Sequence, residues 1–174
     1  MENLIEEAQK GNEGAFTKII IDLEKDLYKI ARARFNSEDD ICEVVQETII
    51  AAFNNIKKLK KPEYFKTWII KILINNCNKM YKKKRKKDLF EYNEDILENT
   101  YSKNEYEIVI DKLDFEGLIK NLKYNERITL ILYYMENLTT KEIGKLLKEP
   151  ESTIRNRISR AKLKLKKELE KGVN

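Results

Sequence analysis

The sequence LTTKEIGKLLKEPESTIRNRISRAK, residues 138–162, predicts the fold of the C-terminal part of the chain. Thr139 and Glu142 stand at the spacing of a capping box, in which each side chain bonds the other residue's backbone N–H and so begins a helix. A turn of about four residues around Pro150 separates this short helix from a longer, polar and cationic one. This order, with Gly144 on the inner face where the two helices approach closely, is typical of a helix-turn-helix and predicts DNA binding.

The residues before this motif predict the rest of a small helical domain over residues 112–174. The segment NERITLILYYMEN, residues 125–137, predicts a helix that supplies core residues to the motif. Ile154 and Ile158 are predicted to face that core from the second helix of the motif. Further core candidates are Leu113, Leu118, Ile119, Leu122, Ile128, Leu130, Ile131, Leu132 and Met135.

Residues 1–87 predict a second helical body. A short helix over residues 2–10 and an amphipathic helix to about residue 35 precede Ser37, an expected N-cap with carboxylates in the turn that follows. Pro62 opens a further helix, which runs into KKKRKK, residues 82–87. Because strand-like alternation occurs nowhere, the predicted fold class is all-α, with two small helical domains. The core candidates of the domain over residues 1–87 are Phe16, Ile19, Ile20, Leu23, Leu27, Ile30, Ala31, Ile41, Val44, Val45, Thr48, Ile49, Ala52, Phe53, Phe65, Trp68, Ile69, Ile72, Leu73, Cys77 and Met80.

Charge divides the 174 residues into three blocks of different sign, although the net charge is only +5. Residues 1–87 carry a net charge of +6, residues 88–117 carry −8, and residues 118–174 carry +7. The periodicity is lost over residues 88–111, which we interpret as an acidic linker between the two domains. Domains with a positive net charge of this kind commonly bind nucleic acid. The alternative is that the charges only keep the helices solvated.

Composition argues against an enzyme. The chain has no His, which excludes Ser-His-Asp and Cys-His nucleophile systems and any His-ligated metal site. Cys42 and Cys77 are too few for a disulfide scaffold or a Cys-only zinc site, so we expect no metal and no cofactor. The acidic N-terminus is no secretion signal, and no apolar run approaches a membrane span of about 20 residues, so we expect a cytoplasmic protein.

Both ends of the chain resemble the extracytoplasmic-function (ECF) group of bacterial RNA polymerase sigma factors. The pieces EEAQKGNEGAFTKII, DLYKIARARFNSEDDICEVVQETIIAAFNNI and PEYFKTWIIKILINNCNKMYKKKRKK resemble region 2 of that family, and residues 122–169 resemble region 4. The resemblance implies a subunit that binds the polymerase core through its beta-prime and beta subunits and recognises promoter DNA. It also implies a cognate anti-sigma factor, and no direct insertion into a membrane.

The resemblance places core binding near residues 39–48. A carboxylate-rich helix face there suits a cationic helix partner and would repel DNA, whereas the alternative is a merely solvated face. The expected core polymerase-binding residues are Asp40, Glu43, Gln46 and Glu47.

The resemblance assigns residues 57–87 to recognition and melting of the minus-ten element. Melting needs a surface for an unstacked base, which Tyr64 would offer, and cations that hold the exposed backbone. We expect Trp68 to be a core residue and not a base wedge. The expected minus-ten residues are Lys60, Lys61, Tyr64, Lys66, Lys71, Asn75, Asn78, Lys79 and Lys82.

The resemblance places the second helix of the motif in the major groove of the minus-thirty-five element. The expected residues there are Ser152, Thr153, Arg155, Asn156, Arg157 and Arg160. This chain departs from the family in the turn, where Lys148 replaces the usual Gly and Glu149 the usual apolar residue. We therefore expect a different local geometry in this turn.

Two alternatives stay open from the sequence. A stand-alone helix-turn-helix regulator, with residues 1–87 as a dimerisation or ligand domain, would bind a palindromic duplex without polymerase. A protein-interaction adaptor would use its basic runs only for solubility.

Overall fold

A computed structural model of the chain describes residues 1–91, 117 and 119–172. The chain divides into two compact units, Met1–Ser102 and Lys103–Asn174. Every regular element over the described ranges is helical, which confirms the all-α prediction. The expected linker lies outside the described residues, except that the last helix of the first unit continues to Glu91. None of the described helices combines the length and apolar composition that a bilayer crossing requires.

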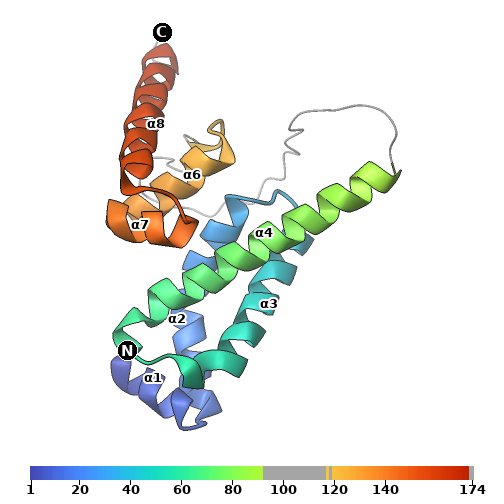
Figure 1. Cartoon of the computed structure of the whole chain (residues 1–174), viewed down its shortest axis with the longest axis vertical. Coiled ribbons are helices and arrows are strands. Elements are labelled where there is room, and N and C mark those ends of the chain that lie inside the picture. The colour runs from blue at the N-terminus through green and yellow to red at the C-terminus, as the bar shows by residue number, and fades with distance from the viewer. Residues whose placement is uncertain (92–116, 118, 173–174) are drawn as a thin grey trace. The chain divides into compact units, whose positions relative to one another are not determined.

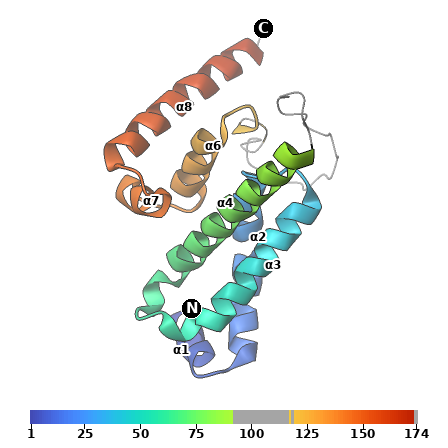
Figure 2. The ribbon, with the colours of Figure 1, turned by 45° about the vertical axis from the view of Figure 1, so that its right-hand side comes forward.

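The first unit is a helical bundle. Helix α1 spans Glu2–Gln9, α2 spans Glu13–Arg32, α3 spans Glu38–Asn55 and α4 spans Phe65–Glu91. The 3-10 turns Ile56–Lys58 and Pro62–Tyr64 connect α3 to α4. Figures 1 and 2 both show α3 and α4 side by side, with α2 packed against them.

The core of this bundle follows the predicted apolar spacing. Its helices α2 and α3 begin in different ways. Leu27, Ile41 and Leu73 are fully buried, one each from α2, α3 and α4. Asn12 caps α2 by accepting the Ala15 N–H at 3.0 Å. Ser37 occupies the predicted N-cap position of α3, although its side chain makes no capping hydrogen bond. The acidic first turn of α3 remains to favour the helix start through the helix dipole.

Two polar contacts fix the packing of α4. The buried Thr48 hydroxyl donates to Val44 O at 2.7 Å and accepts from the Asn76 amide at 3.1 Å, which joins α3 to α4. The Arg34 guanidinium lies 3.7 Å from the ring centroid of Tyr81. The expected core position of Cys77 is confirmed, and burial raises the pKa of its thiol to about 12, so it stays protonated at neutral pH.

The second unit contains the predicted motif. Helix α6 spans Tyr124–Leu130 and continues as a π-helical turn, Ile131–Met135, while α7 spans Thr140–Leu147 and α8 spans Glu151–Gly172. The segment expected as one uniform helix therefore changes its hydrogen bonding at its end, where the Glu136 N–H bonds Ile131 O at 3.2 Å. Ile154, predicted to face the core, is fully buried. Leu113 and Leu118 lie outside the described residues.

The turn between α7 and α8 keeps the geometry that glycine normally supplies. Lys148 has φ 57° and ψ 43°, in the left-handed region. The Glu149 N–H bonds Gly144 O at 2.9 Å, which satisfies a carbonyl at the end of α7. The expectation of a different turn geometry is therefore wrong: Lys148 adopts the strained conformation, since neighbouring contacts hold the turn.

Replacing Lys148 with glycine is expected to stabilise the second unit. Glycine removes a left-handed strain of about 1–2 kcal/mol, and its extra freedom in the unfolded chain returns about half of that. The net gain should be about 0.5–1 kcal/mol, measured by native-state hydrogen exchange of the buried amides of α7. Lys145→Gly, inside α7, is the control and should lose about 1 kcal/mol; equal effects of the two changes would contradict the strain at Lys148.

The predicted capping box at the start of α7 is confirmed. Thr139 N–H donates to Glu142 Oε2 at 2.8 Å, and Glu142 N–H donates to the Thr139 hydroxyl oxygen at 3.3 Å. The Thr139 hydroxyl also donates to the Glu142 carboxylate at 2.7 Å, and this bond is the main cause of the lowered pKa of Glu142.

Thr139→Ala is expected to cost the second unit about 1 kcal/mol at neutral pH. Since the pKa of Glu142 is lowered in the folded state, its contribution is complete above its ordinary pKa and is lost as pH falls through the lowered folded value. The difference between wild type and variant should therefore shrink in acid. Hydrogen exchange of α7 amides at several pH values measures it, with the exposed Lys141→Ala as control; a difference that does not change with pH would contradict this origin.

Candidate functional site

Helix α3 carries an exposed polar face opposite its buried one. Ile41, Val44 and Val45 point into the bundle, whereas Glu43, Gln46 and Glu47 are exposed. We call these three residues the α3 acidic face. Three of the four residues expected to bind the polymerase core thus lie together on one side of one helix.

Asp40, the fourth expected residue, lies one turn before Glu43 on α3, but another helix engages its side chain. Its side chain is only 15% exposed, and its carboxylate accepts Lys84 Nζ of α4 at 2.5 Å. Asp40 therefore ties α3 to α4, which does not fit its expected place on an open face. Helical spacing predicts Asp40 on the same side of α3 as Glu43. It does not reveal the ion pair, because Lys84 is 44 residues away along the chain.

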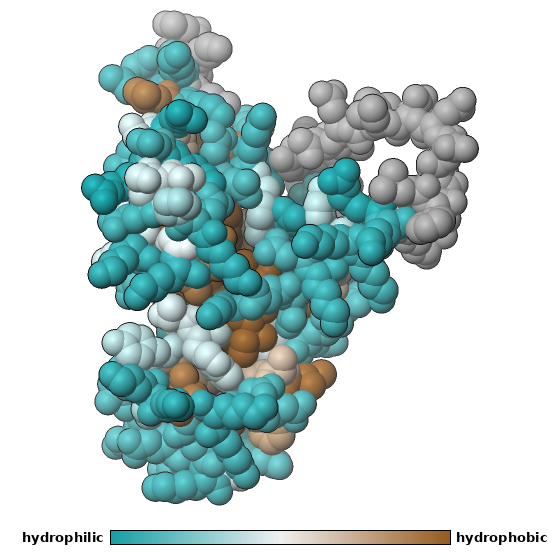
Figure 3. All heavy atoms as spheres, viewed as in Figure 1, coloured by the Kyte–Doolittle hydropathy of each residue, from teal (hydrophilic) through white to brown (hydrophobic). Residues whose placement is uncertain are grey.

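Exposed apolar side chains continue the α3 acidic face toward the end of the helix. Ile50 is 61% exposed and Phe53 is 45% exposed, although the Phe53 ring packs in a T-shaped arrangement with Phe16, with ring centroids 5.2 Å apart. Figure 3 shows brown side chains beside this half of α3. The apolar spacing of α3 predicted a core position for Phe53 and did not include Ile50. The available signal was that Ile50 falls outside the apolar spacing of Ile49, Ala52 and Phe53.

The segment between α3 and α4 presents cations and one aromatic ring. Lys60, Lys61 and Tyr64 are exposed, and Lys61 Nζ lies 5.7 Å from the Tyr64 ring centroid. Gln9 of α1, for which no sequence pattern predicted a role, holds this segment: its amide donates to Ile56 O at 3.0 Å and to Leu59 O at 2.6 Å. We call residues 56–64, fixed in this way, the anchored loop.

Helix α4 extends the polar surface of the anchored loop. The expected residues that are exposed on α4 are Lys71, Asn75, Lys79 and Lys82. Asn78 is half-buried, and Lys66 pairs with Asp26 of α2 at 2.9 Å. Trp68 is half-buried beside Phe65, with ring centroids 5.6 Å apart, so it is only partly the core residue that was expected.

Helix α8 exposes most of the residues expected at the minus-thirty-five element. Ser152, Thr153, Arg155, Asn156 and Arg160 are exposed, and hydrophilic side chains cover most of the viewed surface of α8 in Figure 3. Arg155 pairs with Glu151 one turn earlier at 3.2 Å, and Glu151 also accepts the Thr140 hydroxyl of α7 at 2.8 Å. These contacts join the start of α8 to the start of α7.

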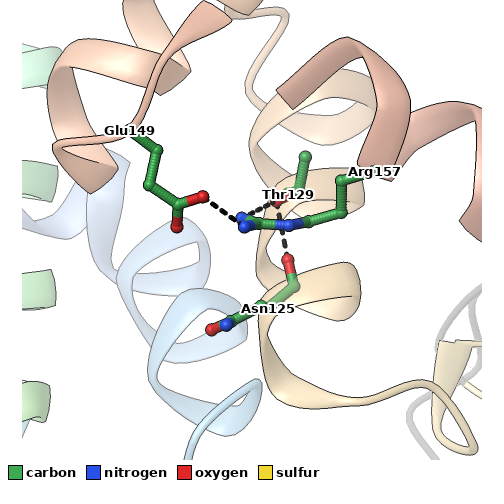
Figure 4. A network of polar contacts seen from close by, with 4 residues as sticks. All are labelled: Asn125, Thr129, Glu149 and Arg157. Atoms are coloured by element: carbon green, nitrogen blue, oxygen red, sulfur yellow. Dashed lines mark hydrogen bonds and ion pairs between the residues drawn. The ribbon is translucent and has the colours of Figure 1, made fainter. Parts of the chain in front are cut away.

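Arg157 lies differently from the other five. Its side chain is 14% exposed and turns toward α6 and the turn, where the guanidinium pairs with the Glu149 carboxylate. It also donates to the Thr129 hydroxyl at 3.3 Å, and that hydroxyl donates to Asn125 O at 2.6 Å (Figure 4). This placement does not fit the base contact expected for Arg157, because its donors face the protein.

Two family models match the chain over most of its length. Residues 19–87 match sigma-70 region 2, and residues 112–165 match sigma-70, region 4. The RNA polymerase sigma factor SigV of Bacillus subtilis is 28% identical over 142 residues, which cover 82% of this chain and 83% of SigV. The ECF RNA polymerase sigma-E factor of Haemophilus influenzae is 27% identical over 179 residues, which cover 91% of this chain and 89% of that factor.

Two solved structures share the fold. CnrH, in complex with the cytosolic domain of CnrY, has a TM-score of 0.66 at 21% identity, over 97% of this chain and 96% of CnrH. The sigma factor RpoE of Bartonella quintana, in complex with the anti-sigma factor NepR, has a TM-score of 0.69 at 20% identity, over 89% of this chain and 96% of RpoE. Taken with the matched regions and the curated relatives, the helical bundle and the helix-turn-helix establish that the chain belongs to the ECF group of RNA polymerase sigma factors.

Proposed function

We propose that this sigma factor works as a dissociable promoter-specificity subunit that uses three separate surfaces of the described residues. The observation that carries the proposal is the separation of charge: the α3 acidic face presents carboxylates, whereas α4 and α8 present cations and amides. Carboxylates repel DNA and suit a cationic protein, while cations attract phosphates. One chain can therefore hold a protein partner and DNA at the same time.

The α3 acidic face, together with Ile50 and Phe53, is proposed to bind the polymerase core. Exposed apolar side chains bordered by polar ones are typical of protein interfaces, because their burial stabilises a complex whose rim charges set its orientation. The family resemblance makes the partner the coiled coil of the beta-prime subunit. Asp40 contributes indirectly, by fixing α3 against α4 through Lys84.

The anchored loop and α4 are proposed to recognise and melt the minus-ten element. Tyr64 is exposed and offers a ring on which an unstacked base can lie, while Lys60 and Lys61 beside it hold the backbone. On α4, Asn75 can bond base edges and the lysines position phosphates. Binding energy drives the melting, so the proposal requires no cofactor and no chemistry on the protein.

Helix α8 is proposed to lie in the major groove of the minus-thirty-five element. Arg155 is exposed near its N-terminal end, where helix-turn-helix proteins contact base edges, and an arginine can pair with guanine through two hydrogen bonds. Ser152, Thr153, Asn156 and Arg160 share this exposure and complete the proposed contact set.

We place the activity in the cytoplasm with the polymerase and propose regulation by a cognate anti-sigma factor. The RpoE structure was solved with the anti-sigma factor NepR, and this chain shares its fold. A partner that covered Ile50 and Phe53 would exclude the polymerase from the same surface.

Run-off transcription with purified core polymerase on genomic fragments tests the proposed function. We expect start sites that depend on both the core enzyme and the added protein. Absence of any such start site would refute the proposal. Tight binding to a palindromic duplex without polymerase would favour a stand-alone regulator instead, and capture of another protein without polymerase would favour an adaptor.

A further inference from the structure

The Arg157 side chain joins α8 to the turn that precedes it and to α6. Glu149 lies in the turn, Arg157 lies two turns into α8, and Thr129 lies on α6 (Figure 4). The guanidinium bonds the Glu149 carboxylate and the fully buried Thr129 hydroxyl. The turn, α8 and α6 are therefore linked through one side chain.

The contact also accounts for the departure of this chain from the family in its turn. Glu149 stands at the position where the family usually has an apolar residue, and its side chain is only 29% exposed. A carboxylate at such a position is costly without a partner, and the Arg157 guanidinium supplies one. The neighbouring Lys148 holds a left-handed conformation, so this turn depends on side-chain contacts that a glycine turn would not need.

We propose that Arg157 is a positioning residue for minus-thirty-five recognition: its ion pair with Glu149 and its hydrogen bond to Thr129 fix the orientation of α8. The inference rests on the proposed function and deepens it, because it divides the arginines of α8 by role. Arg155 and Arg160 are exposed and face solvent, whereas Arg157 acts through the turn and α6. Base preference should therefore depend on Arg155 and not on the chemical identity of residue 157.

A double-mutant cycle on the full-length chain tests this division. The variants are Glu149→Leu, Arg157→Met and their combination, which replaces the ion pair with apolar side chains of similar size. Each single change leaves a partly buried charge without its partner, so each should weaken promoter binding by the reconstituted holoenzyme about tenfold or more. The combination should bind within about threefold of wild type and regain the hydrogen-exchange protection of α8.

Arg155→Met is the matched control, since it removes an exposed arginine from the same helix. It should weaken binding about tenfold, change base preference at one position, and gain nothing from addition of Glu149→Leu. Recovery of protection without recovery of promoter binding in the Glu149–Arg157 combination would overturn the proposal, because Arg157 would then contact DNA. Additive losses in both measurements would overturn it as well.

The cycle separates this inference from the proposed function. Hydrogen exchange uses no DNA, so coupling between Glu149 and Arg157 is decided even if wild type supports no promoter-dependent transcription. If the single variants fail to fold, the comparison of wild type with the combination still decides whether residue 157 must be an arginine.

Discussion

The double substitution Glu43→Lys/Glu47→Lys should weaken binding of the protein to core RNA polymerase about hundredfold. Both side chains are exposed on the α3 acidic face and make no contribution to the bundle core, so the fold should survive. Reversing two charges opposite a cationic helix replaces attraction with repulsion, which costs several kcal/mol. A loss of about 3 kcal/mol corresponds to a roughly hundredfold weaker complex. Fluorescence titration of labelled protein with core enzyme measures this.

The control for this prediction keeps the change in net charge and moves its position. Glu6→Lys/Asp22→Lys alters exposed carboxylates of α1 and α2, away from the α3 acidic face. It should bind the core enzyme within about threefold of wild type, because a dispersed surface charge contributes little. If both double variants bind equally well, the polymerase surface lies elsewhere on the chain.

Gly144→Val should strongly disrupt the second unit, because Gly144 is buried where α7 meets the turn. A Cβ at this position would lie 2.8 Å from Glu149 O, a backbone atom of the turn that cannot rotate away. Overpacking of this kind costs about 3 kcal/mol, whereas the gain in helix propensity over glycine is only about 0.5 kcal/mol. The steric cost therefore wins, and we expect loss of minus-thirty-five recognition together with early hydrogen exchange of α7 and α8.

Lys145→Val is the matched control, because it places the same side chain one residue later on an exposed part of α7. Lys145→Val should change the free energy of unfolding of the second unit by no more than about 0.5 kcal/mol. A Gly144→Val protein with wild-type protection would show that the turn can shift to admit the side chain, and that Gly144 is not required for the motif.

Local patterns predicted the elements and much of the core. The capping box of Thr139 and Glu142 needs only residues three apart, and it forms as expected. The buried positions of Leu27, Leu73 and Ile154 follow from helical spacing alone. Exposure of the α3 acidic face follows from the same periodicity, because three- and four-residue spacing determines which side of a helix faces the core.

Contacts between distant residues were beyond the reach of these patterns. The pairing of Asp40 with Lys84 and the bond of Arg157 to Thr129 join residues on different helices, so only the packed structure reveals them. Helical periodicity places Arg157 near the edge of the buried face of α8. It cannot tell whether that edge meets DNA or another helix.

The prediction for the turn at Lys148 was wrong for a different reason. Backbone preference favours glycine there, so its absence predicted another turn geometry. The contacts of Glu149 and Gly144 around the turn outweigh a strain of about 1–2 kcal/mol. Tertiary contacts therefore overrode a local preference of known size.

The contacts of Gln9 determine which residues must be transferred to move the anchored loop into another sigma factor. Both carbonyls that shape the anchored loop are held by an amide from α1, and α1 precedes the matched region 2, which begins at residue 19. A chimera that grafts only residues 19–87 onto another sigma factor would import the lysines and Tyr64 without the support that gives them their conformation. The portable unit of the proposed minus-ten surface is thus longer than the matched region 2, and it starts at α1.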